Sequence, residues 1–157
     1  MHKKIRLAVV AGVMAAAAGA AIVAEAQTNV AQTVQARKDV MRGNGRALAS
    51  IQPMLRNEQP WNAQTAAAAM TSVRDGMRGL PSLFPAGSGA QAGIETRALP
   101  AIWDQRAAFE AQVASIVTAA DQLVTLAQAG NEAGFRAGMG AVTQVCGSCH
   151  TTFRAPQ

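Results

Sequence analysis

Hydrophobic residues recur at intervals of three and four along most of the chain, which is the spacing of side chains on one face of an α-helix. A first stretch begins at Asn29, a good helix N-cap, and ends or kinks near Pro53. Its apolar positions are Val30, Val34, Met41, Leu48 and Ile51. A second stretch begins at Asn62 and stops at Pro81, with Met70, Val73, Met77 and Leu80 on one face. These patterns predict two helices in the first half.

The second half starts with an irregular connection over residues 81–100, where prolines and glycines are frequent. Helical spacing resumes at Ile102 and continues to Gly130, after which Asn131 can cap a last helix. The apolar face of that last helix consists of Phe135, Met139, Val142, Cys146, Cys149 and Phe153. Four helices with two short connections and one long one predict an all-α, antiparallel four-helix bundle, whose core is a usual place for a cofactor.

The first 26 residues have the pattern of an export signal. Basic residues near the start, Lys3, Lys4 and Arg6, precede an apolar run, and Ala24-Glu25-Ala26 forms a small-x-small cleavage site. We therefore expect residues 1–26 to be a cleaved signal peptide and residues 27–157 to be one periplasmic domain. An uncleaved membrane anchor is the alternative. No later stretch is apolar enough to cross a membrane, so no span is expected after cleavage.

The charge of the chain argues against a nucleic-acid partner. The whole sequence has 14 Lys+Arg and 9 Asp+Glu; residues 1–26 contain three of the cations and Glu25, which leaves 11 against 8, or +3. These remaining cations are scattered along the sequence and form no basic run. A DNA- or RNA-binding protein needs a denser basic surface.

The candidate chemistry lies in five consecutive residues, Cys146-Gly147-Ser148-Cys149-His150. They contain both cysteines of the chain and the only histidine after residue 26. This C-x-x-C-H order is the attachment motif of c-type haem. Two thiols one helical turn apart can form thioethers with the two vinyl groups, and the adjacent imidazole can bind the iron. We expect one covalent haem c, held by Cys146 and Cys149, with His150 as the proximal iron ligand.

Three other functions of this motif are less consistent with the chain. A redox dithiol would need the cysteines at a helix N-terminus in a βαβ unit, whereas these lie near the end of a helix. A zinc site would lack a fourth Cys or His ligand. A structural disulfide between cysteines three residues apart constrains little and gives His150 no role.

The second axial position cannot be filled by another histidine of the chain after residue 26. Methionine, lysine, water, a gas or no ligand are the alternatives. The candidate sulfur atoms belong to Met41, Met54, Met70, Met77 and Met139. Met41 stands out because it lies mid-helix beside Gly43 and Gly45, whereas Met139 is nearly three turns from His150 on the same helix and is expected to pack. The glycines suit either a macrocycle or close helix contact.

The export signal, the four helices, the motif followed by Phe153-Arg154, and the early Arg37-Lys38-Asp39-Val40-Met41 segment together resemble the class II cytochromes c. This family comprises cytochrome c′ and the low-spin cytochrome c-556 type. The resemblance covers residues 28–155. It implies thioethers at Cys146 and Cys149 and a proximal His150.

The resemblance also implies roles for three residues outside the motif. Arg37 corresponds to an arginine near a haem propionate, and Met41 to the residue on the distal face of the iron. Arg154 occupies a position that is usually basic, although a cation at a helix C-terminus is favoured in any protein by the helix dipole.

Two functions follow from the resemblance. The first is a periplasmic one-electron carrier, not an enzyme, in which Met41 binds the iron and redox proteins are the partners. The alternative is a five-coordinate cytochrome c′ that binds NO or CO, with Met41 only covering the iron. A haem-free structural bundle is a third, minor alternative. A homodimer is expected, although the Ala66–Ala69 face of the second helix could equally pack inward.

Overall fold

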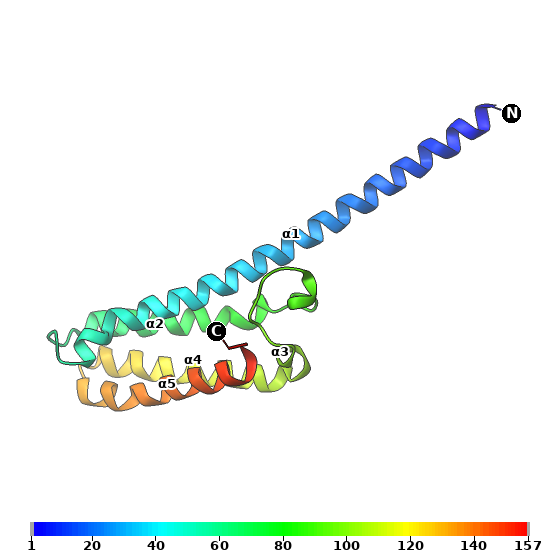
Figure 1. Cartoon of the computed structure of the whole chain (residues 1–157). Helices are drawn as coiled ribbons and strands as arrows, with labels where there is room; N and C mark the ends of the chain where they lie inside the picture. The colour runs from blue at the N-terminus through cyan, green and yellow to red at the C-terminus, as the bar shows by residue number, and fades with distance from the viewer. Residues whose placement is uncertain (1, 157) are drawn as a thin grey trace.

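The computed structural model describes the backbone of residues 2–156 and the side chains of residues 29–156. The helices are α1 (His2–Leu55), α2 (Ala63–Gly79), α3 (Ala101–Asp104), α4 (Arg106–Gln128) and α5 (Glu132–Phe153). The long helices α1, α2, α4 and α5 lie side by side in alternating directions, and α3 is one turn before α4 (Figure 1). The predicted antiparallel four-helix bundle is confirmed. No helix within the described residues is long and apolar enough to cross a membrane.

The ends of α2 and α5 follow the predicted capping pattern. The side-chain oxygen of Asn62 accepts a hydrogen bond from the Thr65 N–H at 2.8 Å, and Asn131 accepts one from the Gly134 N–H at the same distance. Gly130 has φ 68°, in the left-handed region where glycine is favoured, so the chain can turn between α4 and α5.

The start of α1 differs from the prediction. Asn29 lies inside this helix and caps nothing, because an asparagine in a helix interior costs well under 1 kcal/mol and the periodic pattern continues around it. The end of α1 agrees with the prediction, since the helix stops at Leu55, two residues after Pro53. The carbonyl of Pro53 accepts the Glu58 N–H at 2.8 Å, which closes the last turn.

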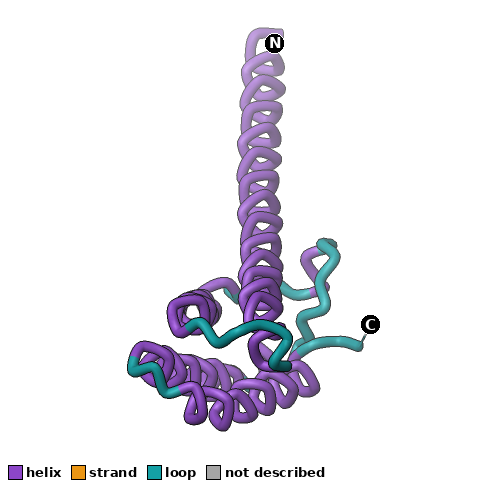
Figure 2. Tube along the Cα trace, turned by 90° about the vertical axis from the view of Figure 1, so that its left-hand side faces the viewer, coloured by secondary structure: helices purple, strands orange, loops and turns teal. Residues whose placement is uncertain are grey.

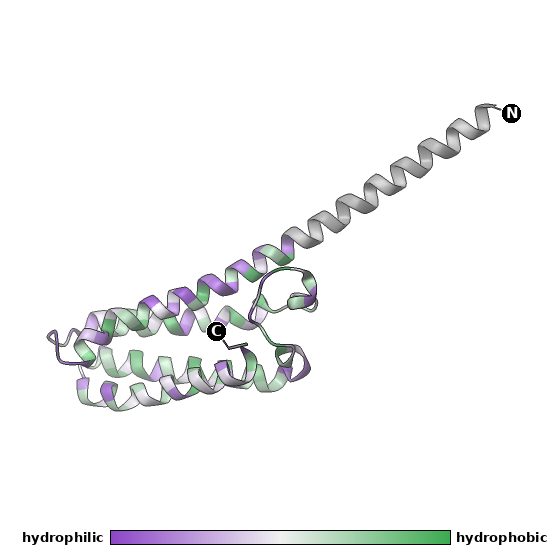
Figure 3. Ribbon diagram, viewed as in Figure 1, coloured by the Kyte–Doolittle hydropathy of each residue, from purple (hydrophilic) through white to green (hydrophobic). Residues whose placement is uncertain are grey.

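The core lies between α2, α4 and α5 and reaches the end of α1 through Ile51 and Met54; apolar positions recur along these helices (Figure 3). Trp61 and Phe135 pack edge to face at 5.1 Å near one end of the bundle. At the other end Phe109 packs edge to face with Phe84 at 5.1 Å and with Phe153 at 5.4 Å. These aromatic pairs fix both ends of the core.

The long connection between α2 and α4 lies against the C-terminal segment (Figure 2). Before α3 it contains two short 3₁₀ turns, Leu80–Leu83 and Ala90–Ala92, and is otherwise irregular, as predicted for residues 81–100. The Leu99 N–H donates to the Phe153 carbonyl at 3.0 Å, and the Ala155 N–H donates to the Arg97 carbonyl at 2.8 Å. The connection thereby brings residues 97–99 to the end of α5 that carries the five-residue motif.

Candidate functional site

Helix α5 presents the motif toward the interior of the bundle. Cys149 is 7% exposed and belongs to the buried face that also contains Phe135, Val142 and Phe153. Cys146 and His150 are half-buried. Because 3.6 residues complete a turn, these two lie on the side of the helix that carries Arg136, which contacts α1.

The contact made by Arg136 sets which residues of α1 and α5 lie at the same height. Its guanidinium donates to the carbonyls of Leu55 and Met54, at 2.8 and 2.7 Å. His150 lies 14 residues beyond Arg136, and Met41 lies 14 residues before Leu55 on a helix of opposite direction. At 1.5 Å per residue, each lies about 21 Å from the contact. Met41 is therefore level with His150.

The same register places Gly45 level with Cys146, and the face of α1 between them is open. From residue 38 to residue 50 no side chain of α1 is buried. Met41, at 36%, is the exposed large hydrophobic side chain of the described residues. A Cβ placed on Gly45 would have no atom within 4 Å. Helix α1 packs extensively on α2, and α4 packs extensively on α5. In the described part of the chain, α1 and α5 make no comparable contact with each other.

This open face fits a flat, largely apolar macrocycle between α1 and α5. It would contact the two thiols, the imidazole and the Met41 side chain, all of which the register brings to within about one helical turn of one another. The macrocycle would cover the exposed Met41 side chain and fill the space between α1 and α5. Two thiols and one imidazole within five residues of one helix are the attachment groups and the proximal ligand of a c-type haem.

Among the five candidate methionines, Met41 alone is left outside the core. Met54, Met70, Met77 and Met139 are all buried, with exposures of 3%, 0%, 3% and 9%. The sulfur of Met54 also accepts the Asn62 N–H at 3.2 Å. A methionine enclosed by other side chains cannot reach a ligand without unpacking the core, so Met41 is the methionine available for coordination.

The glycines of α5 have different surroundings. A Cβ on Gly138 would lie 2.8 Å from Cδ2 of Leu123, so this glycine permits close contact between α5 and α4. A Cβ on Gly140 or Gly147 would meet nothing within 4 Å. Helix contact thus accounts for Gly138, whereas the space at Gly45 on α1 is open at the level of the motif.

The protonation of the motif suits thioether formation and metal binding better than thiol redox chemistry. Burial raises the pKa of the Cys146 and Cys149 thiols, so both are protonated at neutral pH and are poor nucleophiles in exchange reactions. Burial, assisted by the positive charges of Arg154 and Arg97, lowers the pKa of His150. A neutral imidazole is the form that binds a metal.

Arg37 is 4% exposed and holds the long connection against α1. Its guanidinium donates to the Ser88 carbonyl at 2.8 Å, to Thr96 Oγ1 at 2.8 Å and to Ser88 Oγ at 3.2 Å. It also stacks on the Phe84 ring, 4.5 Å from the ring centre. Ser88, Thr96 and Phe84 of the connection therefore contact the Arg37 guanidinium. The family resemblance implied that this group lies near a haem propionate. No signal in the sequence points to Ser88 or Thr96, because loop residues carry no periodic pattern.

We expect Arg37→Ala to lower the free energy of unfolding by about 3 kcal/mol, because it leaves the buried acceptors of the connection without their charged donor. Denaturant unfolding followed by circular dichroism measures this change. Arg42→Ala, on the exposed face of the same helix, is the control and should change stability by less than about 0.5 kcal/mol. Equal stability of the two variants would contradict the anchoring role.

Arg154 follows the last turn of α5 and is exposed. Its backbone pairs with Ala98 in an isolated antiparallel bridge, which holds the C-terminal segment on the long connection. The charge of Arg154 lies close enough to His150 to lower the pKa of that imidazole.

Comparison with known proteins identifies the family of this chain. The family model for cytochrome c′ matches residues 32–154. The chain is 34% identical over 155 residues to a cytochrome c′ of Rhodopseudomonas palustris, covering 97% of both chains. It is also 34% identical over 121 residues to a cytochrome c-556 of Agrobacterium tumefaciens, covering 77% of this chain and 95% of that one.

Solved structures have the same fold. The cytochrome c′ of Rhodopseudomonas palustris aligns with a TM-score of 0.72 at 31% identity, over 80% of this chain and 97% of that one. The cytochrome c′ of Rubrivivax gelatinosus aligns with a TM-score of 0.71 at 23% identity, over 80% and 96% of the two chains.

An all-α bundle with a haem-attachment motif at the end of its last helix defines a c-type cytochrome of the bundle class. The chain belongs to the class II c-type cytochromes, the cytochrome c′ family. Its cofactor is haem c, covalently bound, one per chain. The haem-free structural bundle is therefore excluded as a description of the protein.

Proposed function

We propose that this protein is a periplasmic one-electron carrier whose haem is held by Cys146 and Cys149 and whose iron is bound by His150 and Met41. The observation that carries the proposal is the position of Met41. It is level with His150 across the open face and, of the five methionines whose side chains the structure describes, is the one that the core does not enclose. The relatives include both cytochromes c′ and cytochromes c-556, so the axial ligand of this chain must be argued from its own residues.

The bound haem supplies a reversible couple between Fe(II) and Fe(III), and the chain supplies its ligands and environment. His150 offers a neutral imidazole, and Met41 offers a thioether, which raises the potential relative to a second imidazole or water. Both residues lie within long helices, so the distance between them changes little between oxidation states. A rigid ligand set keeps the reorganisation on electron transfer small, as a carrier of electrons between redox proteins requires.

Export is part of this proposal. The predicted signal peptide, residues 1–26, falls outside the residues whose side chains the structure describes. Its cleavage would place residues 27–157 in the periplasm, where redox partner proteins would be met. A homodimer is also proposed. Ala66 and Ala69 of α2 pack inward, so these two residues are not available for its interface.

A five-coordinate cytochrome that binds NO or CO is the second candidate function, and the exposure of Met41 favours it. A side chain that is 36% exposed can swing away from the iron and admit a small molecule. In that case Met41 covers the distal face without forming a bond.

Carbon monoxide distinguishes the two functions. If Met41 occupies the sixth position, CO must displace it, and we expect the ferrous protein to bind CO at a rate that becomes independent of CO concentration when Met41 dissociation limits the reaction. Stopped-flow absorbance over a range of CO concentrations measures this limit. A second-order reaction that stays proportional to CO concentration throughout would contradict the carrier and support the gas-binding function.

A further inference from the structure

The charged residues away from the candidate site cancel one another. Five carboxylates of α2, α4, α5 and the connection after α1 form ion pairs with neighbouring arginines. These carboxylates are Glu58, Asp75, Glu110, Asp121 and Glu132. Paired surface charges produce little field beyond about a Debye length.

The cations near the open face are less compensated. We define the basic rim as Lys38, Arg42, Arg46, Arg97 and Arg154. Two carboxylates, Asp39 and Glu95, lie within two residues of a rim cation in the sequence. In the described part of the chain, Asp39 forms an ion pair with Arg42, whereas Glu95 forms none. The six other cations after residue 26 equal in number the six other carboxylates. The net charge of +3 of residues 27–157 is therefore that of the five rim cations together with Asp39 and Glu95.

The basic rim borders the open face between α1 and α5, where the haem is proposed to lie, on two sides. Lys38, Arg42 and Arg46 are four residues apart and so form one stripe along α1, adjacent to the positions of Met41 and Gly45.

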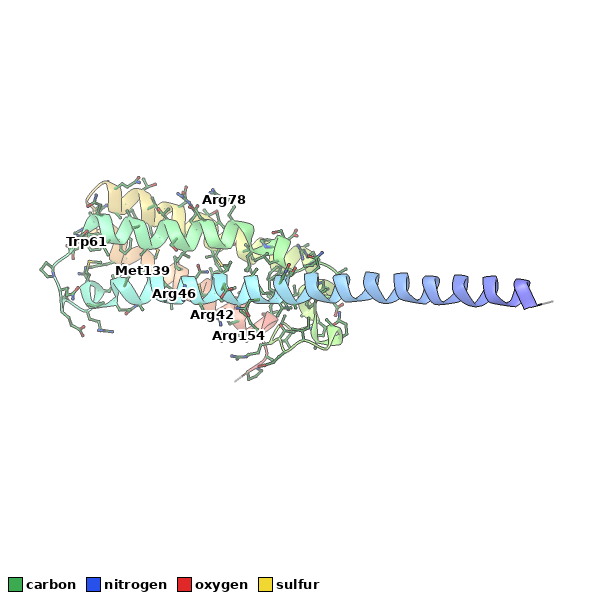
Figure 4. The ribbon with its side chains drawn as sticks, turned by 90° about the horizontal axis from the view of Figure 1, so that it is seen from above. Arg42, Arg46, Trp61, Arg78, Met139 and Arg154 are labelled. Atoms are coloured by element: carbon green, nitrogen blue, oxygen red, sulfur yellow. The ribbon has the colours of Figure 1, made fainter. Side chains whose placement is uncertain are left out.

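On the other side, Arg154 lies four residues after His150, and Arg97 donates to the Ala155 carbonyl at 2.6 Å. Figure 4 shows Arg42, Arg46 and Arg154 on one flank of the bundle and Arg78, on α2, on the opposite flank. The positive charge therefore lies on two sides of the edge at which an electron would leave.

We propose that the basic rim is the docking surface for a redox partner with an acidic face, which it orients so that the proposed haem edge meets the partner's redox centre. This inference rests on the proposed electron-carrier function and names the chemistry of its partner. Complementary charge raises the rate of encounter by up to about 10³-fold at low ionic strength. It gives little affinity at high salt, which suits a partner that must leave after each transfer.

The test follows oxidation of the ferrous holoprotein by an acidic plastocyanin, a blue-copper protein, in a stopped-flow instrument. At about 10 mM ionic strength the Debye length is about 30 Å, and at about 0.15 M it is about 8 Å. We expect the wild-type rate constant to fall about tenfold between the two conditions. Arg46→Glu should lower the low-salt rate about tenfold and weaken its salt dependence.

Arg78→Glu is the matched control, since Arg78 has a 63% exposed side chain on α2 and the substitution changes the net charge by the same amount. Its rate should stay within about twofold of wild type. Equal effects of the two variants, or a wild-type rate independent of salt, would overturn the docking proposal.

A small cationic oxidant, tris(phenanthroline)cobalt(III), separates this inference from the function on which it rests. Arg46→Glu should react faster than wild type with this reagent, because the repulsion at the rim is reduced. Failure of the wild-type protein to transfer an electron to either oxidant would refute the carrier function itself. Transfer to both oxidants with no effect of Arg46→Glu would leave the carrier function standing and refute only the docking surface.

Discussion

Replacing both Cys146 and Cys149 with alanine should yield a polypeptide that loses all of its haem on denaturation. The wild-type chain should keep one haem, because thioether bonds survive unfolding whereas iron–ligand bonds do not. A haem-stained denaturing gel, together with the mass of the intact chain, measures the difference. The expected change is from complete retention to none, the largest effect of any substitution considered.

Ser148→Ala is the matched control for the cysteine variant, because Ser148 lies between the cysteines and its exposed hydroxyl bonds only to the Val145 carbonyl, at 3.0 Å. This variant should retain haem as the wild type does. Each single cysteine variant should keep the group through one bond. Retention of haem by the double variant through denaturation would show that the attachment lies elsewhere in the chain.

Met41→Ala should convert the ferric protein from low spin to high spin and lower its reduction potential by on the order of 0.1 V or more. The thioether stabilises Fe(II) relative to Fe(III), and its removal leaves the sixth position open or filled by water. Electron paramagnetic resonance reports the spin state, and a redox titration reports the potential. The same variant should bind CO without a limiting step.

Met139→Leu is the control for this substitution, since Met139 is buried and the two side chains have similar volumes. We expect the spin state and potential of this variant to match those of the wild type. A Met41→Ala protein with unchanged spectrum and potential would remove Met41 from the coordination of the iron and make the cytochrome c′ type of function the better one.

The elements of the fold could be predicted from sequence because each carries local signals. Asn62 and Asn131 cap their helices, and the face from Phe135 to Phe153 is buried where the periodicity places it. Asn29 misled the prediction, since a capping residue also occurs inside a helix when the pattern on both sides continues. Periodicity and capping residues do not predict the conformation of irregular segments. The contacts of Arg37 with Ser88 and Thr96 therefore could not be predicted from the sequence.

The site was only partly readable from sequence. The motif residues are contiguous, so Cys146, Cys149 and His150 could be assigned together. The choice among the methionines required the three-dimensional structure. Burial distinguishes Met41 from Met70 and the others, but the spacing of the residues in the sequence does not show which methionine is buried. The basic rim was missed for a related reason. Its cations are scattered along the sequence and are gathered only by the antiparallel register and by the bridge between Ala98 and Arg154.

The electronic spectrum of the purified ferric protein at neutral pH tests the central claim most directly. Coordination by His150 and Met41 predicts a low-spin spectrum with the weak charge-transfer band of a methionine–iron bond. A high-spin spectrum without that band would contradict the claim that Met41 binds the iron, and with it the assignment of this cytochrome as an electron carrier.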